Sequence, residues 1–289
     1  MKIKRIVILL SLLICGVKIS AQCFPPFSVN VDKYKTLDSA YMKCTYRLKS
    51  VKDTLNPEQI KSGLIDIQTL QIGEKMSKYF SRSYLDYNLK SQELSKKSQN
   101  IPTFTNNGSY GYEIFCKTDL VNKITVTDLG TMLFANFKYE DDISDMNWII
   151  KKDTMTILSY LCQKAVTTFR GRIYEAWFTN EVPINNGPWK FRGLPGLIMK
   201  VSDLQKYFVF ECVGIQKLKK KEPIKFYTVK YTDISRKDLQ KLYVRTHNDL
   251  AASSQMKGVT LAQRNPTTGK LEKVTHSKKK LEYNPIELK

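Results

Sequence analysis

The sequence predicts a mainly β fold, an antiparallel meander accompanied by one or two packed helices. Three observations predict it. Short segments rich in Tyr, Phe, Ile and Thr alternate apolar with polar residues along the chain, turn-forming residues separate these segments, and only two stretches repeat apolar residues at helical spacing. No Gly/Ser-rich or Pro-rich linker and no internal repeat divides the sequence. We therefore expect residues 22–289 to form a single domain.

The predicted strands are short and follow each other closely, as in a meander. In the first half of the chain they fall at residues 40–48, 64–72, 76–81, 112–117, 123–127, 132–139 and 148–150. In the second half they fall at residues 170–179, 189–191, 197–201, 207–215 and 224–231. Asn186 and Gly187 lie between two strand patterns and indicate a hairpin, and residues 203–206 close the next one.

A second turn signal follows closely and predicts a structural turn rather than a ligand loop. It is formed by Leu194, Pro195, Gly196 and Leu197. Proline presets φ near −65° at the second position of a type II turn, and glycine accepts the positive φ needed at the third. The sequence therefore predicts a type II turn with Gly196 in the positive-φ region.

Two helices are predicted, at residues 84–95 and 233–252. In the second, Ser235 is a candidate N-cap and Asp238 stands in the capping-box position. Its apolar residues recur near helical spacing at Leu239, Leu242, Tyr243 and Leu250. We expect this stripe to pack on the sheet; a membrane-surface role for the basic face of the helix is the alternative.

Residues 1–21 have the organisation of a secretory signal peptide. Three cations within residues 2–5 precede an apolar run over residues 6–17, and small residues offer a cleavage site after Ala21. The run is too short to span a membrane, which takes about 20 apolar residues. The alternatives are an uncleaved anchor and a lipoprotein, although Cys15 and Cys23 lack the small preceding residue that acylation favours. We expect export and no transmembrane segment in the mature chain.

The chain is strongly basic, with a formal net charge of +20. Removal of residues 1–21 takes away four cations and no carboxylate, which leaves +16. Such a field attracts anionic surfaces over about 8 Å at physiological salt. Export excludes nucleic acid as the expected partner, so acidic glycans, lipid phosphates or acidic peptides become candidates. The alternative is that the lysines, including the runs at 219–221 and 278–280 near predicted turns, only solvate the surface.

Five cysteines remain after cleavage, and the odd number predicts at least one free thiol or an intermolecular bridge. They are Cys23, Cys44, Cys116, Cys162 and Cys212. No CxxC pair occurs, and three of the five stand in strand patterns, where a lone cysteine is typically a small buried hydrophobe. We expect at most one or two disulfides.

Residue patterns that carry chemistry are sparse. The two histidines, His247 and His276, have no HExxH context, and phosphate-loop, dinucleotide and GxSxG patterns are absent. We therefore expect no cofactor, no metal and no catalytic residue that the sequence can name. The alternatives are a calcium site in the acidic group at residues 140–145, a carboxylate pair made of Glu175 with Glu181 or Glu211, and a Cys162 and His247 nucleophile pair.

The residues around the predicted turn carry a family resemblance. Beyond residues 193–198 it extends to residues 157–165, Phe169, Gly171, Arg172, Tyr174, Ala176, Trp177, Val182, Pro183, residues 187–191 and the ending YNPIEL at 283–288. The sequence resembles the GLPGLI family of Bacteroidota, exported proteins whose biochemical role is undefined. The resemblance implies a curved β-sheet domain, a bowl or open half-barrel, distantly similar to the bowl-like N-terminal domain of type II peptide N-glycanases. It supplies no catalytic residues.

If the sheet is a bowl, its concave face can present aromatic rings and arginines to a glycan, lipid or peptide. The candidate ligand-binding residues are Tyr174, Trp177, Trp189, Arg170 and Arg172. The alternative is that these rings fill the core. We expect a non-catalytic binding or accessory protein in the periplasm or on the periplasmic face of the outer membrane. Its partner would be an anionic envelope component, a peptide or a TonB-dependent outer-membrane receptor; the alternative is a hydrolase of envelope glycans or peptides.

Overall fold

A computed structural model describes residues 30–97, 110–120, 122–129, 135–256, 260–265, 268–277 and 280–289, together with the backbone of three short strands nearer the N-terminus and in the loop at 104–105. The predicted signal peptide and its cleavage site lie outside the described residues, apart from the backbone of β1 (Val7–Leu10). In the described part, no helix combines the length and the apolar character that crossing a membrane would require.

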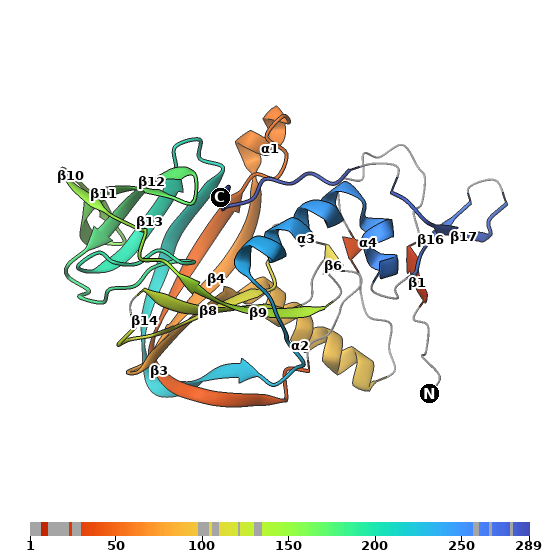
Figure 1. The fold of residues 1–289 in the computed structure, drawn as a ribbon. Coiled ribbons are helices and arrows are strands. Elements are labelled where there is room, and N and C mark those ends of the chain that lie inside the picture. The colour runs from red at the N-terminus through yellow and green to blue at the C-terminus, as the bar shows by residue number, and fades with distance from the viewer. Residues whose placement is uncertain are drawn as a thin grey trace.

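Twelve strands form one open sheet (Figure 1). The first half contributes β3 (Tyr34–Ser50), β4 (Leu64–Ile72), β5 (Met76–Ser81), β7 (Tyr112–Lys117), β8 (Lys123–Leu129) and β9 (Asn136–Asp142). The second half contributes β10 (Ile149–Ile157), β11 (Tyr160–Phe169), β12 (Arg172–Thr179), β13 (Leu197–Asp203) and β14 (Phe208–Tyr227). Each half is an antiparallel meander, and the pairing of β14 with β3 joins the two. The predicted mainly β meander is therefore confirmed.

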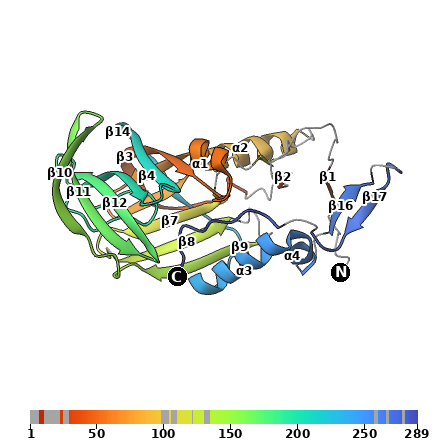
Figure 2. The same ribbon diagram turned by 90° about the horizontal axis from the view of Figure 1, so that it is seen from above.

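The connectivity requires the sheet to curl. β10 is one edge strand, and β9 lies at the other end, followed only by the two-residue parallel strand β15 (Thr232–Asp233). Only residues 143–148 connect β9 to β10, and a chain of this length spans at most about 25 Å. A flat sheet of this width could not be joined in this way, so the two ends bend towards each other (Figure 2). The result is the open bowl that the family resemblance implied.

The described residues contain four helices, against the one or two expected: α1 (Pro57–Ser62), α2 (Arg82–Lys96), α3 (Arg236–Asn248) and α4 (Leu250–Met256). Both predicted helices are found, the second interrupted at Asp249, whose backbone is extended. The predicted cap of α3 is confirmed, because Ser235 Oγ accepts a hydrogen bond from Asp238 N at 3.1 Å. Leu239 of α3 packs into the main core, so the apolar stripe faces the sheet as expected.

Two small sheets complete the described fold. β1 pairs in parallel with β16 (Thr260–Arg264), which pairs antiparallel with β17 (Leu271–Val274). β2 (Cys23–Phe24) pairs with β6 (Phe104–Thr105).

Side chains on the concave face of the sheet form the main core. Along β3 the burial alternates, so that Ala40, Met42, Cys44, Tyr46 and Leu48 are buried. The loop over residues 180–196, between β12 and β13, folds into this space. Its Phe191 contacts the rings of Tyr174 and Phe210 at centroid distances of 4.7 and 5.9 Å. The motif that suggested the family therefore fills the inside of the bowl.

Three local predictions are wrong. Residues 189–191 form a turn inside this loop, and Asn186 and Gly187 do not close a two-residue hairpin, because the whole stretch from 180 to 196 connects the two strands. The lysines at 219–221 lie exposed within β14 instead of flanking a turn. In addition, β11 was not among the predicted strands. The hairpin at residues 203–206 is confirmed between β13 and β14.

The predicted type II turn is also wrong in its backbone geometry. Gly196 is not among the glycines with positive φ, whereas Gly193 has a φ of 94°. Glycine is required at 196 for a different reason: an added Cβ would lie 2.1 Å from the carbonyl oxygen of Thr179 and 2.7 Å from its carbonyl carbon. The backbone bend at residues 194–196 therefore packs directly against the end of β12.

The four cysteines whose side chains are described, Cys44, Cys116, Cys162 and Cys212, are free and buried. Burial raises the pKa of the Cys162 and Cys212 thiols to about 11. These thiols are small core residues, in agreement with the expectation for cysteines in strands. The side chain of Cys23 lies outside the described residues.

Candidate functional site

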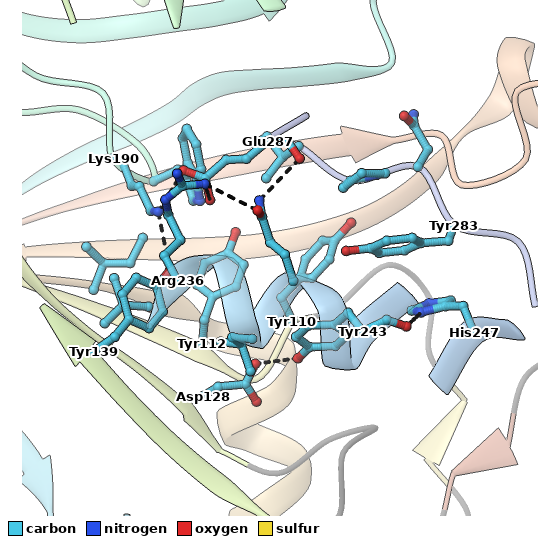
Figure 3. Close-up of a pocket in the computed structure, with 18 of the residues that line it drawn as sticks. Tyr110, Tyr112, Asp128, Tyr139, Lys190, Arg236, Tyr243, His247, Tyr283 and Glu287 are labelled. Carbon is cyan, nitrogen blue, oxygen red and sulfur yellow. Dashed lines mark hydrogen bonds and ion pairs between the residues drawn. The ribbon is translucent and has the colours of Figure 1, made fainter. Parts of the chain in front are cut away.

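A cavity of about 160 Å³ opens between the concave face of the sheet and α3. Strands β7, β8 and β9 form its floor, α3 forms one wall, and residues 283–287 near the C-terminus form another (Figure 3). Residues 189 and 190 of the loop between β12 and β13 contribute from one end. The lining residues are Lys52, Tyr110, Tyr112, Ile114, Val126, Asp128, Tyr139, Trp189, Lys190, Arg236, Leu239, Gln240, Tyr243, His247, Tyr283, Asn284, Pro285, Ile286 and Glu287.

One end of the cavity is aromatic. The rings of His247 and Tyr283 are stacked, with centroids 4.1 Å apart and an angle of 25° between their planes. Tyr243 lies nearly parallel to Tyr283 at 6.4 Å, and its hydroxyl donates a hydrogen bond to Asp128. Tyr110 stacks on Tyr112 at 5.4 Å. Flat faces from α3, from the C-terminal segment and from β7 therefore converge here (Figure 3).

His247 is held in one protonation state. Burial lowers the pKa of its imidazole to about 4, an effect that exceeds the opposing hydrogen bond to Tyr243. Because a carbonyl oxygen only accepts, the 2.7 Å contact between His247 Nδ1 and Tyr243 O makes Nδ1 the donor. The ring is therefore neutral at physiological pH, with Nε2 available as an acceptor.

The opposite end is charged but internally neutralised. Lys190 Nζ donates to Asp141 Oδ2 at 2.7 Å, to Glu287 Oε1 at 2.8 Å and to the Tyr139 hydroxyl at 3.3 Å. Arg236 lies 3.7 Å from Asp141 and 3.9 Å from Glu287. Burial by itself would lower the pKa of Lys190, but its anionic and phenolic neighbours outweigh burial and leave that pKa raised. Every charge here has a partner of opposite sign.

The C-terminal segment is fastened across the bowl by hydrogen bonds to both halves of the sheet. Leu288 N donates to Arg170 O, and the Tyr174 hydroxyl donates to Ile286 O, each at 2.8 Å. Arg172 donates to Pro285 O at 2.7 Å and to Asn284 Oδ1 at 2.5 Å. Asn284 Nδ2 in turn donates to Val51 O at 2.8 Å. These hydrogen bonds hold the YNPIEL segment in place, where it forms a wall of the cavity.

Lys52 stands apart from the other charged residues of the lining. Its Nζ lies 6.0 Å from the centroid of the Tyr110 ring, and within the described ranges it forms no ion pair. Burial lowers the pKa of this ammonium to about 8, and the carboxylate of Glu282 offsets only part of that effect. Within the part of the chain that the structure describes, Lys52 is thus a cation of the lining without a direct ion-pair partner.

The candidate ligand-binding residues occupy four kinds of position. Trp189 lines the cavity, while Tyr174 and Arg172 lie behind the C-terminal segment and hold it in place. Arg170 lies in the turn between β11 and β12. It forms ion pairs with Asp141 in β9 and with Asp145 in the connection from β9 to β10. Trp177 points to the opposite face of β12, where its ring lies 5.8 Å from Lys164 Nζ. Ligand binding by these five residues stays a prediction.

Sequence reasoning missed most of the residues that line the cavity. Tyr243 was in the predicted apolar stripe of α3, and Tyr283 was in the ending YNPIEL, but nothing in the sequence indicated that the two rings face each other. Tyr110, Tyr112 and Asp128 were read only as parts of, or neighbours to, predicted strands. A tyrosine on the inner face of a predicted strand, such as Tyr112 in β7 or Tyr139 in β9, is the signal that could have pointed to the cavity.

The alternative chemistries are not assembled at this cavity. Glu175 pairs with Lys164 at 2.8 Å, and Glu211 pairs with Arg47 at 2.6 Å, both away from the cavity lining. Cys162 is buried outside the lining to which His247 belongs. In the acidic group at 140–145, Asp141 and Asp145 bind Arg170. Over the described residues, no cluster of three or more His, Cys, Asp or Glu residues is arranged to hold a metal ion.

Comparisons with known proteins extend this description. The solved structures that the chain is similar to include two of PNGF-II in different space groups, with TM-scores of 0.45 and 0.43 and 17% identity in both cases. These matches cover 71% and 69% of this chain but only 32% of the other, so the chain spans about a third of the length of those proteins. No curated protein matches the chain.

A family comparison matches the segment that carries β12 and the loop motif. Residues 170–200 match the model of a family described as "Protein of unknown function (Porph_ging)". The same stretch contains the GLPGLI sequence at residues 193–198. The resemblance found in the sequence is therefore confirmed: over residues 170–200 this chain has the signature of the GLPGLI-type family Porph_ging.

Proposed function

We propose that this is an exported protein of the cell envelope that acts by binding, and that its cavity holds one sugar residue of a glycan. The observation that carries the proposal is the convergence of aromatic faces and hydrogen-bonding groups in one cavity on the concave side of the sheet. Export is supported by the organisation of residues 1–21. The partner in the envelope, whether an anionic component, a peptide or a TonB-dependent receptor, stays a prediction.

The volume sets the size of the ligand. At about 160 Å³ the cavity is close to the engineered cavity of about 150 Å³ that binds benzene. It therefore has room for one six-membered ring and not for a lipid chain. The benzene cavity is lined by aliphatic residues and stays dry, whereas this one is lined by phenols, amides and charged groups. A ring that carries polar substituents suits it better than a plain hydrocarbon.

The chemistry of the walls favours a sugar. Burial raises the pKa of Tyr110 and of Tyr139 to about 12, so both phenols stay protonated and can donate as well as accept hydrogen bonds. The flat faces of Tyr283 and Tyr243 offer apolar surface to the C–H face of a pyranose ring. Gln240 and Asn284 add amide groups within the same lining. Ring faces with a few placed polar groups are typical of small-ligand sites.

Binding is favoured over hydrolysis because the carboxylates of the cavity are engaged. Glu287 accepts a hydrogen bond from Lys190, and Asp128 accepts one from Tyr243. Glycoside hydrolysis needs one carboxyl group to deliver a proton and a second to act as a base or nucleophile on the opposite side of the bond. Here both groups already stabilise the walls of the cavity, which suits a receptor.

The binding prediction is that methyl glycosides bind to the mature protein and that Tyr283→Ala weakens them. Removing a ring that stacks on the ligand loses about 1 kcal/mol, or about fivefold in Kd. Titration calorimetry with a panel of neutral and acidic methyl glycosides measures this. Trp177→Ala is the matched control, because this ring lies on the opposite face of β12 and its loss should leave Kd unchanged. If no glycoside binds, or if only Trp177→Ala weakens binding, the cavity is not the site.

The location prediction is that the mature protein begins at Gln22 in the periplasmic fraction. Cleavage after Ala21 follows from the small residues before that bond. Intact-mass measurement of protein purified from cell fractions checks it. A protein that keeps Met1 and co-sediments with membranes would show an uncleaved anchor instead.

A further inference from the structure

We infer that the sugar bound in this cavity is acidic, and that its carboxylate is held by the ammonium group of Lys52. The inference rests on the proposed function and names the ligand class of the same site. It starts from the balance of charges in the lining. Lys190 and Arg236 form ion pairs with Glu287 and Asp141. Asp128 accepts a hydrogen bond from the neutral hydroxyl of Tyr243.

Lys52 has no such arrangement. Among the described residues it makes no ion pair, although its ammonium reaches the cavity beside the ring of Tyr110. A cation that is partly withdrawn from water and not directly paired is destabilised in the free protein. A ligand carboxylate that enters the cavity would supply the missing partner, and the interaction would be stronger here than on the open surface because little water screens it.

The groups around Lys52 favour an anion over a second cation. His247 on α3 is neutral, and its Nδ1 is occupied by Tyr243 O. Tyr110 and Tyr283 keep their protons, because burial raises the pKa of both phenols. Glu282 is the carboxylate whose charge acts on Lys52, and it offsets only part of the effect of burial. A ring stacked near Tyr283 with a carboxyl substituent therefore matches both the shape and the charge of this end.

The pH dependence follows from the lowered pKa of Lys52, which is about 8 in the free protein. Below this value the ammonium is charged and attracts the carboxylate. As the pH rises through it the charge is lost, so the affinity for an acidic sugar should fall while that for a neutral sugar should not. Bound carboxylate stabilises the charged form, which moves the midpoint to a higher pH in the complex.

The test compares methyl β-glucuronide with methyl β-glucoside, which differ by a carboxylate in place of a hydroxymethyl group. In the mature wild-type protein at pH 7 we expect the glucuronide to bind about tenfold more tightly. Lys52→Met should bring the Kd values of the two sugars together, and an unchanged circular dichroism spectrum and melting temperature show that the variant is folded. Lys61→Met is the control, because it removes the same charge from an exposed position on α1 outside the lining.

Each outcome is decisive. Equal affinity for the two sugars in the wild type, or a preference that survives Lys52→Met, overturns the inference and leaves the proposed sugar site intact. A preference lost equally in Lys61→Met would assign it to the overall charge of the protein and also overturns the inference. Binding of neither sugar overturns both the inference and the proposed function.

Discussion

Replacing Gly196 with valine is expected to lower the free energy of unfolding by about 3 kcal/mol or more. The reason is steric. A Cβ at this position would lie 2.1 Å from Thr179 O and 3.1 Å from Asn180 N, and these are backbone atoms that cannot rotate away. Relief requires the bend at residues 194–196 to move off the end of β12, which would also displace the buried side chains of Leu194 and Leu197. Chemical and thermal denaturation measure the change.

A second glycine provides the control. Gly214 in β14 has no heavy atom within 4 Å of the position of an added Cβ and does not have positive φ. Gly214→Ala should therefore stay close to wild type in stability, while Gly196→Ala should already be clearly destabilised. If Gly196→Val unfolds like wild type but loses its ligand, the bend is a recognition loop and its structural role is wrong.

Replacing Lys190 with methionine is expected to cost about 3 to 5 kcal/mol of stability. The substitution keeps the approximate volume of the side chain and removes its charge. It leaves Asp141 and Glu287, both buried, without the ammonium that lies 2.7 and 2.8 Å from them. Arg170 stays 3.4 Å from Asp141, and Arg236 stays 3.7 and 3.9 Å from the two groups, but neither guanidinium is close enough to replace the ammonium fully. Urea denaturation at pH 7 measures the loss.

The matched control is Lys164→Met on the outer face of the sheet. Lys164 also pairs with a carboxylate, Glu175, at 2.8 Å, but both side chains are partly exposed to water. A pair of this kind contributes about 0 to 1 kcal/mol. If Lys190→Met lowers the free energy of unfolding no more than Lys164→Met does, the ion pairs at the charged end of the cavity do not stabilise the fold.

The pH dependence of the Lys190 contribution has a definite sign. Its pKa is raised in the folded protein, so the unfolded state loses its proton first. The stabilisation is therefore complete below the ordinary lysine value of about 10.4 and declines as the pH rises towards the folded value. At physiological pH Lys190 is protonated, and its ion pairs with Asp141 and Glu287 are fully formed.

The fold could largely be predicted from the sequence because strand alternation is a local signal. The predicted strands at 64–72, 76–81 and 112–117 coincide with β4, β5 and β7. The strand β11 was not predicted because the turn before it lacks the usual glycine, asparagine or aspartate. Leu158 and Ser159, with φ values of 49° and 70°, form the turn before it, and Arg170 with Gly171 forms the turn after it. Ile157 pairs with Tyr160, and a two-residue hairpin loop of this kind takes positive φ at both of its residues, so Leu158 and Ser159 adopt the left-handed region although neither is glycine.

The cavity could not be predicted in the same way, because its walls come from segments that are distant in the sequence. His247 and Tyr283 meet because Leu281 N donates to His247 O and because the C-terminal segment is fastened further along to Arg170, Arg172 and Val51. No local pattern encodes that path. Of the aromatic residues singled out near the motif, Tyr174 supports the C-terminal wall from behind, whereas Trp189 lies in the cavity lining.

The pairing of β14 with β3 has a consequence for how the protein folds. It brings Tyr34 next to Tyr227, which lies 193 positions later in the chain. The two halves of the sheet are joined through this strand pairing. Contacts so far apart in sequence form slowly, because a long loop must close before they are gained. Until then β3 presents an unpaired edge of 17 residues, the kind of edge that recruits strands from other chains. Folding of this protein should therefore be slow and prone to aggregation, and its rate should be set by the formation of the pairing between β3 and β14.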